Sequence, residues 1–227
     1  MREIVFDTET TGFDPRSGDR MVEIGCIEMV NRVPTGRTYH AYFNPDRAMP
    51  LAAEQVHGLG DAFLADKKRF HEHAEELVAF LGDAPLVAHN AQFDFGFLNH
   101  ELGLCGFAEV VLDRMIDTLA IARRRHPGAK HTLDALCGRY GIDRSHRVLH
   151  GALLDAELLA QVYVELTGGR QIGLELAASE SHAVLEVTTF RPRQGQFREP
   201  RPHSASADEL ARHKAFLESL ESPVWAS

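Results

Sequence analysis

The stretch Glu3-Ile4-Val5-Phe6-Asp7-Thr8-Glu9, close to the N-terminus, begins as an apolar run rich in strand-forming residues and ends in two acids. Residues two apart on a strand point to the same face, so Asp7 and Glu9 present both carboxylates together at the end of this strand. An Asp-x-Glu pattern by itself arises often by chance. It predicts chemistry only when other acids of the chain join it.

The periodicity of apolar residues predicts three more strands and five helices. The strands cover 22–30, 38–43 and 86–88, and the first of these alternates apolar and polar residues as a half-buried strand does. The helices cover 70–81, a segment that begins just after His89-Asn90, and then 115–125, 133–140 and 152–166. Strands that lead into interleaved helices and strands indicate an α/β domain, ending near Thr167-Gly168-Gly169. The three early strands predict a meander.

Further acids occur in two of these helices. Asp94 falls in the first turns of its helix, and Asp155 interrupts the apolar run of the last helix, where a core-facing carboxylate is costly unless it is paired or metal-bound. His150 comes just before that helix, so a loop can direct it to the same place. Carboxylates from distant segments repel one another unless divalent cations neutralise them. With Asp7 and Glu9, the pattern predicts a two-metal site beside a histidine base.

The composition is that of a soluble globular protein. The chain has 227 residues, 44% of them hydrophobic and 25% charged, which fits one enzyme-sized domain with an appended tail. It contains no apolar run of the roughly 18 to 20 residues that span a bilayer, and its N-terminus lacks the apolar core of a signal peptide. Cys26, Cys105 and Cys137 form no close pair, which argues against disulfides or a zinc site. We expect a cytoplasmic protein that does not bind membranes.

The formal net charge of −9 is unfavourable for binding nucleic acid through lysine and arginine alone. Divalent cations bound at the acidic site would reverse the local charge. Two basic runs, 67–69 and 123–125, could contact a phosphate backbone. The alternative interpretation of both runs is solvated helix surface.

Three motifs resemble those of the DEDDh family of 3'-5' exonucleases. They are Phe-Asp-Thr-Glu-Thr-Thr-Gly at 6–12, His-Asn-Ala-Gln-Phe-Asp at 89–94 and His-Gly-Ala-Leu-Leu-Asp-Ala at 150–156. The tyrosine type of this family has Tyr four positions before the last acid, whereas Gly151 stands there in this chain and His150 stands five positions before. The resemblance implies a ribonuclease H-like fold, a mixed sheet flanked by helices.

The resemblance also implies a role for each motif residue. Asp7, Glu9, Asp94 and Asp155 would bind two divalent cations, and His150 would deprotonate the attacking water. Oxygen ligands without cysteine favour Mg²⁺ or Mn²⁺ over zinc. The substrate, the 3' end of a DNA strand, would be contacted by Asp7, Glu9, Thr10, Thr11, Gly12, His57, Asn90 and Asp155.

Similarity continues outside the three motifs, in Asp-Thr-Leu-Ala at 117–120, His-Pro-Gly at 126–128 and Thr-Leu-Asp-Ala-Leu-Cys at 132–137. These segments resemble the proofreading branch of the family, the epsilon subunits of bacterial DNA polymerase III, over roughly residues 1–169. The resemblance implies removal of mismatched 3'-terminal nucleotides as 5'-monophosphates during replication.

The C-terminal part of the chain changes in character. Residues 190–206 are rich in proline and polar residues and too poor in apolar ones to fold alone, so we expect a flexible linker within 170–205. Ser206-Ala207-Asp208-Glu209 has the form of a capping box that begins a short helix. The segment 206–227 resembles the tail that anchors epsilon subunits to the polymerase alpha subunit, with Trp225 as an interface anchor. The alternative for this tail is a loosely ordered end.

Immediately after the predicted domain, Gln171, Leu174 and Leu176 resemble the short glutamine-led motif that binds the sliding clamp, the beta subunit. A simple helix extension is the alternative. Two other functions also stay open from the sequence: a stand-alone enzyme of the same family that trims RNA or DNA ends, and a non-catalytic replisome adaptor that keeps only the fold and the tail.

Overall fold

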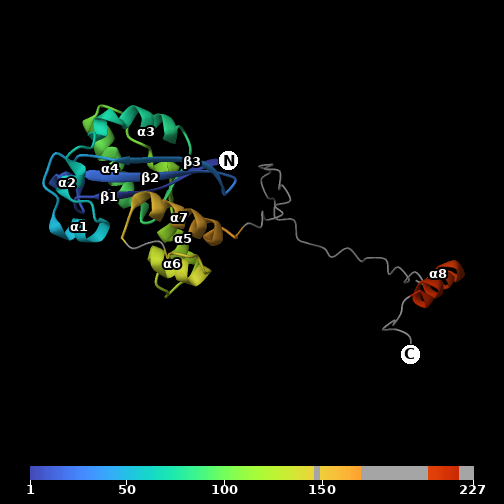
Figure 1. Cartoon of the computed structure of the whole chain (residues 1–227). Coiled ribbons are helices and arrows are strands. Elements are labelled where there is room, and N and C mark those ends of the chain that lie inside the picture. The colour runs from blue at the N-terminus through green and yellow to red at the C-terminus, as the bar shows by residue number, and fades with distance from the viewer. Residues whose placement is uncertain (146–148, 170–203, 220–227) are drawn as a thin grey trace, which may run out of the picture. The chain divides into compact units, whose positions relative to one another are not determined.

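The computed structural model describes residues 1–145, 149–169 and 204–219 (Figure 1). The chain divides into two units, Met1–Ala177 and Ala178–Ser227, and each is described by itself. The first unit holds a five-stranded mixed sheet flanked by helices, which confirms the expected α/β fold. Within the described ranges, no helix combines the length and the apolar character needed to cross a membrane.

The sheet has the strand order β3-β2-β1-β4-β5. Its strands are β1 (Arg2–Thr10), β2 (Met21–Val30), β3 (Val33–Tyr42), β4 (Leu86–Ala88) and β5 (Met115–Asp117). The first three strands are antiparallel neighbours, so the predicted meander is confirmed, and β4 and β5 run parallel to β1. The carboxyl ends of β1, β4 and β5 therefore meet at one edge of the sheet, where α/β proteins place their ligands.

Helices and short turns connect and cover these strands. The α-helices of the first unit are α1 (Leu51–His57), α2 (Asp61–Leu64), α3 (Ala74–Leu81), α4 (Ala91–Leu104), α5 (Thr118–Arg125), α6 (Leu133–Tyr140) and α7 (Ala152–Leu166). The 3-10 turns are η1 (Pro15–Ser17), η2 (Phe70–Glu72) and η3 (Leu112–Arg114). Figure 1 shows α3 and α7 on opposite sides of the sheet.

Alternate residues of β1 point to opposite faces of the sheet, and each face has its own core. Phe6 belongs to the core formed with α3 and α4, where its ring meets that of Phe95 with centroids 5.8 Å apart. Val5 belongs to the second core, formed with α7 residues such as Leu159. Both faces are covered, so polar side chains gather at the carboxyl edge.

The different lengths of β1 and β4 leave room at that edge. Val5 pairs with Val87, so β4, which ends at Ala88, extends only to the level of Phe6. The residues of β1 from Asp7 onward project beyond β4. The first turn of α4, which begins three residues after β4 ends, can therefore approach this projecting end of β1.

The helix predicted over 115–125 is wrong in its first turn. Met115–Asp117 forms β5 alongside β4, and α5 begins only at Thr118. The Asp117 side chain accepts a hydrogen bond from the backbone N–H of Leu119 (2.9 Å) and so caps α5. Pairing with β4 outweighs the helical periodicity of this segment, a tertiary effect that the pattern of apolar residues does not contain.

Three smaller predictions also need correction. The helix predicted over 70–81 begins at Ala74, because the preceding residues form η2, and the strand predicted over 38–43 begins at Val33. The alternating strand β2 is buried on both faces instead of one. Its acids are tolerated there because they are paired: Glu23 with His40 (2.7 Å) and Glu28 with Arg2 (2.7 Å).

The second unit contains α8 (Ala207–Glu218), and the predicted capping box at its start is confirmed. Ser206 Oγ accepts from the Glu209 N–H (3.3 Å), and the Ser206 N–H donates to Glu209 Oε2 (2.8 Å). Leu210 and Phe216 are each 58% exposed, and α8 buries no side chain. The predicted partner-binding residues Gln171, Leu174, Leu176 and Trp225 lie outside the described residues.

Candidate active site

The predicted acids converge on one pocket at the carboxyl edge of the sheet. Its volume is about 650 Å³, and three elements supply its acids: β1 with Asp7 and Glu9, α4 with Asp94, and α7 with Asp155. His150, just before α7, and Asn90, just before α4, also line it. The structure therefore brings together the four acids and the histidine that the sequence singled out.

Gly25 explains how α7 comes close enough to β1. It pairs with Asp7 across the antiparallel strands, so both residues face α7. A Cβ atom on Gly25 would lie 2.3 Å from both the backbone nitrogen and the Cα of Leu153, which no side chain could tolerate. The missing side chain lets the first turn of α7 rest directly on the sheet beside Asp7. Asp155 follows two residues later in that turn.

Asp94 is held from the other side of β1. Thr8 points to the α4 face, and its hydroxyl donates to Asp94 Oδ1 (2.8 Å) within the buried interior. Asp94 and Asp155 both lie in the first turn of their helices, where the positive end of the helix dipole favours a negative charge. Asn90 precedes α4 with a left-handed backbone (φ 65°), which turns the chain sharply out of β4.

Crowding of these acids makes ionisation costly. Burial raises the pKa of Asp7 well above its ordinary value, and the nearby carboxylates of Asp94, Glu9 and Asp155 raise it further. Burial raises the pKa of Asp94 to about 7, although the hydrogen bond from Thr8 opposes this shift. Both shifts favour the neutral, protonated forms of these acids as long as no cation offsets their charge.

The donor atoms fit a divalent metal. Glu9, His150 and Asp155 each bring one possible ligand atom within 4.8 Å of the others. The four acids supply only hard oxygen donors, and the three cysteines of the chain are not among the lining residues. Magnesium and manganese prefer such donors, whereas structural zinc sites favour sulfur and nitrogen.

His150 combines access to solvent with a fixed orientation. Its side chain is 47% exposed, and its Nδ1 donates to Asp155 Oδ2 (3.1 Å). Its backbone N–H donates to the carbonyl oxygen of Val56 at the end of α1 (3.2 Å). Since a carboxylate only accepts, the proton lies on Nδ1, and Nε2 is the nitrogen that can take up another proton.

His57 lies outside the lining of the pocket but next to it. It is buried at the end of α1, and its Nδ1 accepts the Leu59 N–H (3.0 Å), so the ring proton lies on Nε2. Nε2 faces the backbone of Thr10 without completing a hydrogen bond of ordinary geometry. Burial lowers the pKa of His57, which keeps the ring neutral. A buried donor at this place is suited to an oxygen acceptor of a ligand.

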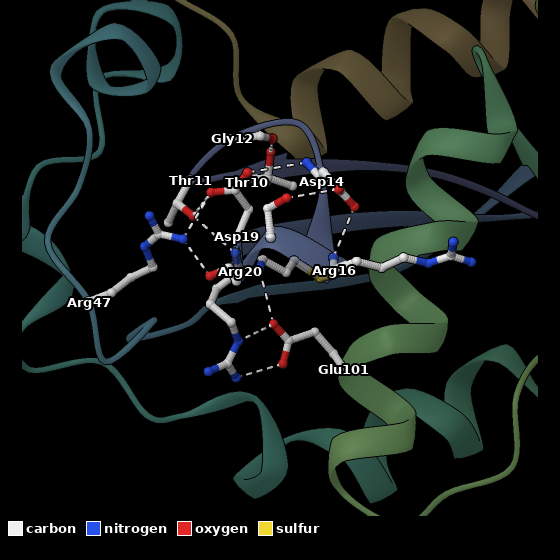
Figure 2. A network of polar contacts seen from close by, with 12 residues as sticks. Thr10, Thr11, Gly12, Asp14, Arg16, Asp19, Arg20, Arg47 and Glu101 are labelled. Atoms are coloured by element: carbon white, nitrogen blue, oxygen red, sulfur yellow. Dashed lines mark hydrogen bonds and ion pairs between the residues drawn. The ribbon is translucent and has the colours of Figure 1, made fainter.

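The turn that follows Glu9 is organised by its own polar contacts (Figure 2). Thr10 Oγ1 donates to the Gly12 carbonyl (2.6 Å), and the Thr11 N–H donates to the carbonyl of Arg20 across the turn (2.9 Å). A Cβ atom on Gly12 would lie 2.2 Å from Asp19 Oδ2. The pocket lining does not include Thr10, Thr11 or Gly12. The two threonine hydroxyl groups and the glycine therefore serve to shape the turn.

One ion pair fastens this turn to α4. Arg20 donates to both oxygens of Glu101, each at 2.7 Å, and the Met21 N–H donates to the same carboxylate (3.2 Å). Figure 2 shows Glu101 reaching from α4 toward Arg20. Glu101 is only 1% exposed, and its charge is tolerated because a bidentate partner satisfies it.

Comparison with known proteins shows the family of this chain. The RNase_T exonuclease family matches residues 4–163, a span that contains the four acids and His150. The DNA polymerase III subunit epsilon of Rickettsia felis is 49% identical over 223 residues, covering 97% of this chain and 97% of that protein. The subunit of the same name from Escherichia coli is 40% identical, covering 97% of this chain and 93% of its own length. This chain belongs to the exonuclease family, in its branch of DNA polymerase III epsilon subunits.

Solved exonuclease structures have the same fold. Exonuclease X in complex with 5' overhanging duplex DNA is similar with a TM-score of 0.57 and 25% identity, covering 73% of this chain and 90% of that one. Exonuclease I is similar with a TM-score of 0.63 over 73% of this chain and 40% of its own, and at 17% identity this likeness concerns the fold alone. The ribonuclease H-like arrangement expected for this exonuclease is confirmed.

Sequence reasoning missed several residues that position the active site of this exonuclease. Gly25 admits α7, Thr8 orients Asp94, and Asp117 accepts the backbone N–H groups of Asn90 (3.1 Å) and Leu119 (2.9 Å). For Asp117 a signal was available, because Asp followed by Thr-Leu-Ala is a typical helix start. For Gly25 and Thr8 the partners lie more than 80 residues away in the chain, so no local pattern could indicate them.

Proposed function

We propose that this chain is the proofreading 3'-5' exonuclease of a replicative DNA polymerase. It would remove mismatched nucleotides one at a time from the 3' end of a DNA strand and release 5'-monophosphates. The observation that carries this proposal is the convergence of four acids from β1, α4 and α7 with His150 in one pocket. The names of its relatives, DNA polymerase III subunit epsilon, support the replicative setting.

The carboxylates of Asp7, Glu9, Asp94 and Asp155 would hold two divalent cations, Mg²⁺ or Mn²⁺. Their oxygen donors and the raised pKa values of Asp7 and Asp94 support this assignment. Bound cations would neutralise the acids, lower the pKa of a bound water and stabilise charge on the oxygen that leaves. Thr8 contributes by holding Asp94 in place.

His150 acts as the general base. Its Nε2 takes the proton from the attacking water while Asp155 holds the opposite ring nitrogen. The water oxygen bonds to phosphorus and the bond from phosphorus to the 3'-oxygen breaks. The departing 3'-oxygen takes a proton from solvent water and becomes the new 3'-hydroxyl of the shortened strand, and the nucleotide leaves with a 5'-phosphate. The partial exposure of His150 allows the proton to pass on to solvent.

The 3'-terminal nucleotide would lie between the acids and His57. The buried Nε2–H of His57 can donate to a sugar or phosphate oxygen, and Asn90 contributes an amide at the rim of the pocket. Asp7, Glu9 and Asp155 would meet the same nucleotide through its scissile phosphate. Thr10 and Gly12 would contact it through their backbone, because the Thr10 hydroxyl is engaged within the turn.

The domain arrangement extends the proposal to partners. Residues 1–169 would form the catalytic domain, residues 170–205 would carry the clamp-binding motif and a linker, and residues 206–227 would bind the polymerase alpha subunit. Gln171, Leu174 and Leu176 are the proposed contacts with the sliding clamp, and Trp225 is the proposed anchor on alpha. The exposed Leu210 and Phe216 of α8 support a partner-binding role for this tail. Tethering would raise the local concentration of an acidic enzyme at the primer end.

Hydrolysis of a 3'-mismatched primer tests the catalytic part of this proposal. The variant His150→Gln should lower kcat by roughly 10² to 10⁴ because the general base is lost. His71→Gln is the matched control, since His71 is an exposed histidine that is not among the residues lining the pocket, and this variant should retain full activity. Equal activity in His150→Gln and the wild type would refute the mechanism, and a wild type inactive with Mg²⁺ and with Mn²⁺ would favour a non-catalytic adaptor.

A second measurement separates a tethered proofreader from a stand-alone nuclease. Addition of the purified alpha subunit should stimulate digestion of the mismatched primer, and deletion of residues 206–227 should abolish the stimulation but leave basal hydrolysis unchanged. Trp225→Ala should weaken the stimulation in the same way. Digestion that is indifferent to alpha, or faster on RNA ends than on DNA ends, would favour the stand-alone alternative.

A further inference from the structure

Three consecutive arginines end α5, and the structure gives each a different environment. Arg125 donates to the carbonyl oxygen of Leu166 at the end of α7 (2.7 Å). Arg124 is exposed and has no hydrogen bond or ion pair within the described ranges. Arg123 lines the active-site pocket. Arginines suit the negative end of a helix dipole, which accounts for the run as a whole but not for the placement of Arg123.

Arg123 differs from the acids of the pocket in its charge and is not paired with them. Among the described residues that line the pocket it is the one arginine or lysine, and it forms no ion pair with any described carboxylate. The other basic run is engaged differently: Lys67 pairs with Asp66 (2.7 Å) and Arg69 with Asp46 (2.6 Å). The guanidinium of Arg123 is therefore available to a ligand in the pocket.

Hydrogen bonds within α6 and within the connection between α5 and α6 stabilise the side of the pocket that carries Arg123. His131 Nε2 donates to the carbonyl oxygen of His126 (2.7 Å), which closes the connection between α5 and α6. Thr132 caps α6 by accepting the Ala135 N–H (3.2 Å), and both His131 and Thr132 line the pocket beside Arg123. His89 follows directly after β4 and lines the same pocket, so the side of the pocket that carries Arg123 lies next to the end of β4.

The direction of the bound strand decides what Arg123 meets, and this step rests on the proposed function. The scissile phosphate lies at the acids, and the terminal nucleoside lies on the side of His57 and the turn after Glu9. The rest of the strand must then leave on the opposite side of the acids, along α5 and α6. We propose that Arg123 binds the phosphodiester one linkage upstream of the scissile one. An arginine fork can hold two oxygens of such a phosphate at once.

The pair Arg123→Gln and Arg124→Gln tests this proposal on single-stranded DNA. Arg123→Gln should raise KM about tenfold, and the slope of log(kcat/KM) against log[salt] should become shallower by about 0.7, the value for one lost phosphate contact on a single strand. Arg124→Gln, equal in charge and on the same helix, should leave both quantities unchanged. Equal effects of the two variants would overturn the proposal.

A minimal substrate separates failure of this proposal from failure of the proposed function. The 5'-p-nitrophenyl ester of thymidine monophosphate has a scissile phosphate but no upstream one, so Arg123→Gln should hydrolyse it at the wild-type rate. Loss of that activity in Arg123→Gln would assign the arginine to chemistry or folding instead. A wild type that hydrolyses neither this ester nor DNA would overturn the proposed function and this proposal with it.

A substrate with one uncharged linkage identifies which phosphate Arg123 binds. On a DNA strand with a single methylphosphonate one linkage upstream of the scissile phosphate, the KM of the wild type should be about tenfold higher than on unmodified DNA. The KM of Arg123→Gln should hardly change, because the variant lacks the guanidinium that binds the charge of this linkage. Penalties that are the same in both proteins would overturn the assignment to this linkage.

Discussion

Asp7 is buried on β1 within the field of four other carboxylates, and this burial and crowding cost free energy whenever no cation is present. In the proposed function the same crowding would attract divalent cations, which would offset this cost. Thr8, the neighbouring residue, offsets part of it by donating to Asp94. At the scale of single residues, the active site is thus a place where stability and ligand affinity oppose each other.

The variant Asp7→Asn should therefore stabilise the metal-free protein while removing its response to cations. A gain of about 1 kcal/mol would raise the melting temperature by roughly 2 to 4 °C for a chain of this size. The wild type should be stabilised further by Mg²⁺ or Mn²⁺, and the variant much less. The measurement is a thermal melt with and without each ion. Asp113→Asn, an exposed acid outside the pocket lining, is the control and should behave as the wild type.

The identities of the acids could be read from the sequence, because a carboxylate in an apolar helix such as Asp155 is visible without any structure. The contacts that make those acids a site could not. Thr8 and Asp94 are 86 residues apart, and Arg20 and Glu101 are 81 apart. Such pairs arise only from the packing of elements, so a single sequence holds no local sign of them.

Two elements, β2 and the first turn of α7, meet more closely than side chains normally allow. Gly25 makes this possible, and through it the position of Asp155 relative to Asp7 depends on the approach of a helix to a strand. The strands and helices themselves were mostly predictable, since apolar periodicity dominates in segments such as 133–140 and 152–166. The error at Met115–Asp117 arose where pairing with β4 selected a strand over a helix.

The variant Gly25→Ala should force α7 away from the sheet. We expect a loss of about 1 to 3 kcal/mol in the free energy of unfolding, as for other overpacked interiors, together with a lower kcat because Asp155 moves with the helix. Gly138→Ala in α6 is the matched control: its added methyl meets no atom within 4 Å, and the change should stabilise the protein by about 0.5 to 1 kcal/mol. Urea denaturation and primer digestion measure the two effects. Unchanged activity in Gly25→Ala would show that the close approach is not needed.

At the scale of the whole molecule, the sheet with its helices and the tail with α8 are separate units. The first unit contains both cores and the complete pocket, whereas α8 buries no side chain. Stability should therefore reside in the first unit.

A chain that ends at Gly169 should melt within about 2 °C of the full-length protein, because α8, the helix described beyond Gly169, buries no side chain. It should also hydrolyse the nitrophenyl ester at the full rate. Differential scanning calorimetry of the two chains makes the comparison. A markedly lower melting temperature for the shorter chain would mean that residues beyond Gly169 contribute to the fold.

The two outer strands of the sheet, β3 and β5, have a consequence for solubility. A free strand edge can recruit a strand from another molecule and so begin aggregation. Here β5 has only three residues, and β3 carries Pro34, which lacks an N–H, and the charged Arg37, with an irregular register opposite Ile27 and Met29. Each of these features discourages intermolecular pairing. The acids lie at the carboxyl ends of the central strands, and the two outer strands are thereby protected from pairing with strands of other molecules.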